Sequence, residues 1–104
     1  MAIAKAGIVT LPQIPLMFEA PTSVCTSFYK SKGWGPASRV VWEHLPSTAV
    51  CVFYLDGSCS IPVFVSPPLE TTGFFQMESE ATPEGVSIES FTVISYAKYL
   101  GHPT

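Results

Sequence analysis

The sequence predicts an all-β fold, a small Greek-key β-sandwich or barrel formed by one domain over residues 1–104. Its apolar residues fall into short runs rich in β-branched and aromatic side chains, and prolines and glycines separate these runs. Two of the runs, 51–55 and 61–65, flank the turn signal Asp56-Gly57. With 47% hydrophobic and only 12% charged residues, the composition is typical of a folded core rather than of a disordered chain.

The first half of the chain is expected to contain edge and interior strands. Pro12 and Pro15 interrupt the first twenty residues, and proline cannot donate a ladder hydrogen bond, so this extended segment belongs at a sheet edge. The run 37–45 also fits a helical face, but Arg39 to Trp42 favours a strand. The segments expected to be extended are, in order, 7–19, 24–29, 37–45, 50–55, 61–65, 74–78 and 86–96.

The second half is expected to supply the centre of a sheet. Residues 50–55 are apolar on both faces, as is typical of a central strand in a sandwich. In the run 86–96 the apolar positions change phase midway, which predicts a bulge near Glu89. We expect one helical turn after this strand, ended by Gly101.

The net charge and the hydropathy pattern give no reason to expect binding to nucleic acid or a membrane-spanning segment. A net charge of −3 gives no basic footprint for nucleic acid, and no apolar run has the length of a membrane span. The prolines also break the apolar N-terminal stretch, so it does not read as a signal peptide. Two compartments stay open: the chain acts in the cytoplasm, or a leader has been removed and the protein is secreted.

The three cysteines allow one internal disulfide. If Asp56-Gly57 formed a two-residue turn, Cys51 and Cys59 would lie three residues out of register, about 10 Å apart and beyond the reach of a disulfide. A wider loop would bring these two cysteines together. A tight hairpin and a Cys51–Cys59 bond therefore exclude each other, and both alternatives stay open. Cys25 is expected to be a small buried hydrophobe.

The sequence contains no pattern that specifies catalysis or a cofactor. Its cysteines and histidines lack the paired short spacings of zinc sites, and no Gly-x-Ser-x-Gly elbow or glycine-rich phosphate loop is present. We therefore predict no metal and no cofactor, and the catalytic residues of any reaction stay unknown. Whether the protein is an enzyme also stays open.

Aromatic side chains provide the candidate binding site. Two tryptophans, four tyrosines and seven phenylalanines are more rings than so small a core is expected to enclose, although ordinary core filling is the alternative. Trp34 lies between two glycines, and Phe74 and Phe75 are adjacent, so on a strand one of them faces outward. The expected contact patch consists of Trp34, Trp42, Tyr54 and Phe74, with Arg39, Glu43 and His44 as polar contacts.

One stretch resembles a known family. Leu45-Pro-Ser-Thr-Ala-Val-Cys-Val-Phe-Tyr-Leu-Asp-Gly-Ser-Cys59, followed by Ile88-Glu-Ser-Phe91, resembles small fungal secreted proteins of the βγ-crystallin-like type. The resemblance runs from Leu45 to Val93. It implies two four-stranded sheets in Greek-key order, and calcium binding in some members. The positions matching the calcium motif are Gly85, Val86, Glu89 and Ser90, of which only Ser90 is one of the usual side-chain ligands, so the site is expected to be weak or lost.

Two functions follow as hypotheses. The first is a non-enzymatic β-sandwich that binds a protein partner, as a secreted effector-like or inhibitor-like protein does. The alternative is a small intracellular enzyme or carrier that encloses a hydrophobic small molecule in an aromatic-lined β pocket. A third possibility is a structural role as a subunit of a homo-oligomer, because few charges are available to cover the surface.

Overall fold

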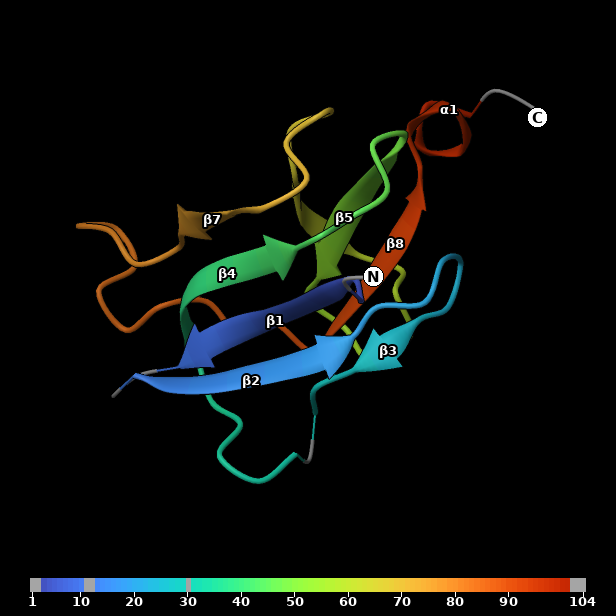
Figure 1. Ribbon diagram of the computed structural model, residues 1–104. Coiled ribbons are helices and arrows are strands. Elements are labelled where there is room, and N and C mark those ends of the chain that lie inside the picture. Colours follow the sequence, from blue (N-terminus) through green and yellow to red (C-terminus); the bar gives the residue numbers. More distant parts are fainter. Residues whose placement is uncertain (1–2, 11–12, 30, 102–104) are drawn as a thin grey trace.

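Two antiparallel sheets of four strands each pack against one another and enclose a hydrophobic core (Figure 1). The computed structural model describes residues 3–10, 13–29 and 31–101, and Pro12 lies outside these ranges. The prediction of a small all-β sandwich is confirmed. The elements, in chain order, are β1 (Lys5–Thr10), β2 (Ile14–Glu19), β3 (Thr26–Ser27), β4 (Ala37–Glu43), β5 (Ala49–Tyr54), β6 (Pro62–Val65), β7 (Gly73–Gln76), β8 (Ser90–Ser95) and the one-turn helix α1 (Tyr96–Tyr99).

Most strands pair with partners that are distant in the sequence. One sheet has the order β2-β1-β4-β7, which we call sheet A, and the other has the order β3-β8-β5-β6, which we call sheet B. Only β1–β2 and β5–β6 are hairpins of consecutive strands. The chain otherwise passes repeatedly between the sheets, and Greek-key connectivity stays a prediction.

The proline-interrupted N-terminal segment is a hairpin rather than a single edge strand. Its second strand, β2, is the edge, while β1 lies inside sheet A between β2 and β4 (Figure 1). The Ala20 N–H donates to the Ala4 carbonyl, so Ala20 and Ala4 form a hydrogen-bonded pair. Hydrogen-bonded and non-hydrogen-bonded pairs alternate along the ladder, which makes Pro15 and Val9 a non-hydrogen-bonded pair. This alternation places the nitrogen of Pro15 on the free side of β2, where no ladder donor is needed.

The predicted strand 86–96 is split between the two sheets, and the predicted bulge near Glu89 stays a prediction. Val86 forms a bridge with Ala37 of sheet A, whereas β8 of sheet B begins only at Ser90. The apolar pattern changes phase because the chain crosses from one sheet to the other between these residues. Gly85 makes the crossing possible: its φ is +82°, and a Cβ there would collide with the Ala37 carbonyl.

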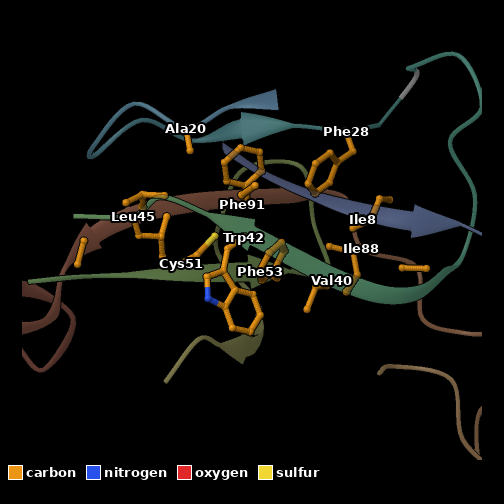
Figure 2. Packing of buried hydrophobic residues seen from close by; sticks show 14 residues of the cluster. Ile8, Ala20, Phe28, Val40, Trp42, Leu45, Cys51, Phe53, Ile88 and Phe91 are labelled. Carbon is orange, nitrogen blue, oxygen red and sulfur yellow. The ribbon is translucent and has the colours of Figure 1, made fainter. Parts of the chain in front are cut away.

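Aromatic rings fill the centre of the sandwich. Phe28 stacks on Phe91 with ring centroids 5.1 Å apart, and Phe53 lies 6.3 Å from both Phe64 and Phe91. Figure 2 shows Trp42 beside Phe53, between the strands of the two sheets. Enclosing each such ring stabilises the fold by roughly 1.5–3 kcal/mol. The buried cluster consists of Ala6, Ile8, Ala20, Phe28, Ala37, Val40, Trp42, Leu45, Ala49, Cys51, Phe53, Ile88, Phe91 and Val93.

The loop between β5 and β6 is wide, which decides against the tight two-residue turn. The Asp56 carboxylate organises this loop by accepting hydrogen bonds from the Ser58 hydroxyl at 2.6 Å and from the backbone N–H groups of Ile61 at 2.8 Å and Ser60 at 2.9 Å. These hydrogen bonds hold the pKa of Asp56 well below its ordinary value of 3.8, and the bond from the Ser58 side chain has the largest effect. The turn signal at this position therefore belongs to a carboxylate-centred loop.

Acidification is expected to weaken the loop. Because the pKa of Asp56 is lower in the folded protein, its charge stabilises the fold above the ordinary value of 3.8, and this contribution disappears as the pH falls through that value toward the folded pKa. The difference in free energy of unfolding between the native chain and Asp56→Asn, measured by urea denaturation, should shrink from about pH 7 to about pH 2. Glu80→Gln controls for the loss of one exposed carboxylate. A difference independent of pH would contradict this role of the charge.

Candidate functional site

Trp42, a predicted contact residue, lies in the core instead. The residue is 1% exposed and sits on β4, an interior strand of sheet A. Its indole Nε1 donates to the Glu70 carbonyl at 2.9 Å, so the single polar atom of the side chain is hydrogen-bonded within the protein and needs no binding partner. For this tryptophan the alternative of ordinary core filling is correct.

Trp34, another residue of the expected contact patch, is half-buried. Its indole Nε1 donates to the Ile88 carbonyl at 2.9 Å, and its ring meets Tyr29 edge-on with centroids 5.2 Å apart. Ile88, to which Trp34 is hydrogen-bonded, is distant in the sequence, so this contact could not be predicted from the glycines that flank Trp34. This side chain fixes the β3–β4 loop to the crossing segment before β8.

Tyr54, at the end of β5, is half-buried in sheet B rather than beside the two tryptophans. Partial burial raises the pKa of its phenol, and a hydrogen bond with the Thr92 side chain opposes that effect. The four predicted patch residues therefore do not form one surface.

Phe74 does face outward and is the most exposed aromatic side chain among the described residues. It is 62% exposed and pairs with Val41 of β4, on the face of sheet A turned away from the core. The guanidinium carbon of Arg39 lies 5.7 Å from the centre of its ring, a cation–π arrangement. The Nε of Arg39 is buried and has no hydrogen-bond partner among the described residues. The structure thus brings together two of the predicted site residues.

Phe75 extends this feature around the edge of the sandwich. It is 48% exposed, and its ring stacks on Phe64 of β6 with centroids 4.5 Å apart. Because β6 and β7 are edge strands of opposite sheets, the two rings join the sheets along one side of the molecule. We call the group Arg39, Phe64, Phe74 and Phe75 the β7 surface. Sequence analysis missed Phe64 and Phe75 as members, although the Phe-Phe pair signalled one outward ring.

Glu43 and His44 mark the end of β4 and do not join the β7 surface contacts. Both are exposed, and Glu43 pairs with Lys5 in the ladder. His44 has a φ of +54°, and its backbone N–H donates to the Thr72 hydroxyl at 3.0 Å. The structure therefore assigns Glu43 to the last position of β4 and His44 to the bend that follows it.

The cysteines pair differently from the predicted Cys51–Cys59 bond. Cys25 and Cys59 form the disulfide, with Cα atoms 6.0 Å apart. Cys51 is free and buried in the core, where burial raises the pKa of its thiol. Its backbone exchanges hydrogen bonds with Ser66, so the wide loop carries Cys59 past the end of the strand rather than opposite Cys51. The expectation that Cys25 is buried is also wrong, since it is exposed.

An open apolar hollow of about 470 Å³ lies at one end of the sandwich, at the start of α1. Its volume falls within the range of small-molecule sites. Tyr96 is its single aromatic side chain, and Leu69 on the rim is 81% exposed. None of the predicted site residues lines it. The lining residues are Ser47, Thr48, Ala49, Pro68, Leu69, Ser95, Tyr96 and Ala97.

Residues 3–10, 13–29 and 31–101 contain no group of three or more His, Cys, Asp or Glu placed to hold a metal ion. No helix within the same ranges has the length and apolar character to cross a membrane. Ser90, a position of the calcium-motif resemblance, is buried, and its hydroxyl donates to the Asp56 carbonyl.

Comparisons with protein-family models, curated proteins and solved structures find no match to this chain. The resemblance to βγ-crystallin-like proteins stays a prediction.

Proposed function

We propose that this protein is a non-enzymatic binding module that engages a protein partner through the β7 surface. The observation that carries the proposal is the exposure of two adjacent phenylalanines, Phe74 at 62% and Phe75 at 48%, on one edge strand. Aromatic and arginine side chains are the residue types that contribute most to protein interfaces. The β7 surface combines both types around one edge strand, with Arg39 and Phe74 on its outer face and Phe75 and Phe64 on the opposite face.

The contacts between the rings indicate that the β7 surface is preorganised for binding. Phe75 is held by the stack on Phe64, and Phe74 by the guanidinium of Arg39, so binding would immobilise few freely rotating groups. The strand beneath them is fixed by its ladder with β4. These features favour a preorganised contact over a loop that must first become ordered.

The Cys25–Cys59 bond supports the extracellular form of this proposal. Disulfides persist mainly in oxidising compartments, and this one is partly accessible because Cys25 is exposed. A secreted effector-like or inhibitor-like protein fits these conditions.

A matched pair of variants tests the proposal. Proteins retained from an extract by the immobilised native chain are purified, and their Kd values are measured for the native chain, Phe74→Ser and Leu69→Ser. A central aromatic contact contributes about 2 kcal/mol or more, so Phe74→Ser should raise Kd at least roughly thirtyfold. Leu69→Ser removes an even more exposed apolar side chain, at the hollow rather than on the β7 surface, and should leave Kd unchanged.

Two outcomes would overturn the proposal. Equal Kd values for the native chain and Phe74→Ser would remove the β7 surface from binding. Loss of binding in Leu69→Ser alone would instead assign binding to the apolar hollow, and would favour the alternative of a carrier for hydrophobic molecules.

A further inference from the structure

The edge of β7 differs from the other edges of the two sheets. Exposed sheet edges are usually protected by proline, charge, bulges or very short strands. β2 carries Pro15 and Glu19, β6 begins at Pro62 beside a register shift, and β3 has only two residues. Strand β7, Gly-Phe-Phe-Gln, is exposed and contains no proline or charged residue. Within the described sheets it is the edge best suited to accept another strand.

The ladder shows which backbone groups of β7 are available. The Met77 N–H donates to the Ser38 carbonyl at 2.7 Å, and the register continues through Val40 with Phe75. Hydrogen-bonded pairs alternate in an antiparallel ladder, so Phe75 turns its N–H and C=O toward β4. Phe74 and Gln76 therefore direct theirs to the free side, which gives two donors and two acceptors at the spacing of an incoming strand.

Arg39 adds a positive charge above this edge. It pairs in register with Gln76, yet its guanidinium lies over the Phe74 ring, so the charged end is above the edge strand itself. Its described contacts include no ion pair with a carboxylate, and its buried Nε has no hydrogen-bond partner within residues 3–10, 13–29 and 31–101. A carboxylate arriving on the outer face of an added strand would complement this group, since arginine binds carboxylates through paired N–H donors.

We propose that β7 binds an extended peptide segment by strand addition, with an Asp or Glu of that segment beside Arg39. The inference rests on the proposed function and specifies the partner's form. In the added strand, the acidic residue of the peptide lies opposite Phe74 or Gln76, and its side chain is on the outer face of sheet A. Adjacent residues of the segment point to the opposite face, where Phe75 and Phe64 favour apolar side chains. The recognised pattern is an acidic residue flanked by apolar ones.

The test uses a displayed library of random ten-residue peptides selected on the native chain. Selected peptides should contain an acidic residue between two apolar residues. Binding of one such peptide should weaken at least tenfold in Arg39→Gln and in Gln76→Pro, while Gln76→Ser should bind normally. Proline at position 76 removes an outward N–H but no ladder bond to β4, so Gln76→Pro should remain folded.

Amide exchange gives a second readout that a general loss of packing would not reproduce. On peptide addition to the native chain, the amides of Phe74 and Gln76 should become protected, while that of Phe75, already bonded to β4, should change little. Peptides without an acidic preference, or unchanged exchange at Phe74 and Gln76, would overturn strand addition. If a protein partner is lost in Phe74→Ser but binds Gln76→Pro and Arg39→Gln normally, the proposed function stands and this inference fails.

Discussion

Replacing Trp42 by alanine is expected to destabilise the fold by about 3–5 kcal/mol, the usual cost of removing a large core ring. The side chain is 1% exposed, and its ring lies 5.9 Å from that of Phe64 at the junction of the two sheets. The cavity would also leave the Glu70 carbonyl without the indole N–H. For a domain of this size, Tm should fall by at least about 12 °C, as measured by thermal unfolding.

Two control variants separate the core from the surface. Trp42→Phe keeps most of the apolar area but loses the hydrogen bond to Glu70, so its loss of stability should be intermediate. Phe74→Ala removes an exposed ring and should change the free energy of unfolding by no more than about 0.5 kcal/mol. If Trp42→Ala and Phe74→Ala had similar effects on stability, the division between core and β7 surface would be wrong.

Removing the Cys25–Cys59 bond is expected to have the second large effect. The bond closes a loop with a sequence separation of 34, for which the chain-entropy relation gives a stabilisation of about 3.8 kcal/mol. The double variant Cys25→Ser/Cys59→Ser should therefore lower the free energy of unfolding by roughly this amount in urea denaturation. A reducing agent should lower the native chain's stability similarly and leave the double variant unchanged.

Thiol labelling supplies the matching chemical control. In native oxidised protein, Cys51 is the one free cysteine and is buried, so alkylation should be slow until the chain unfolds. After unfolding without reductant, one label should be incorporated, and after reduction three. Three labels in the unreduced, unfolded chain would show that the disulfide is absent, and would also remove the support it gives to an extracellular location.

Local patterns were sufficient to predict the strands, because a strand's alternation and its flanking turn residues are short-range features. The segment 37–45 and the proline-containing edge strand are examples. The phase change before β8 was visible in the sequence, but its cause was not. Recognising the crossing requires knowing that Val86 pairs with Ala37 of the other sheet. That pairing is long-range and has no local signal.

The candidate site was harder to predict for the same reason. Trp34 and Trp42 satisfy their indole N–H groups on carbonyls distant in the sequence, so their burial could not be inferred from neighbouring residues. Cys25 joins Cys59 because β3 lies beside β8. Phe74 was identifiable, since two adjacent rings on a strand must face opposite sides. Its association with Arg39 was not, because it depends on the register between β4 and β7.

The interleaved order of the strands has a kinetic consequence. Because β3 pairs with β8 and β4 pairs with β7, both sheets remain incomplete until the C-terminal third of the chain has docked. Such non-local pairings are associated with folding times of milliseconds to seconds. During that interval the newly made polypeptide exposes β-prone segments that the finished molecule covers, so its yield during biosynthesis should depend on how quickly those last segments arrive.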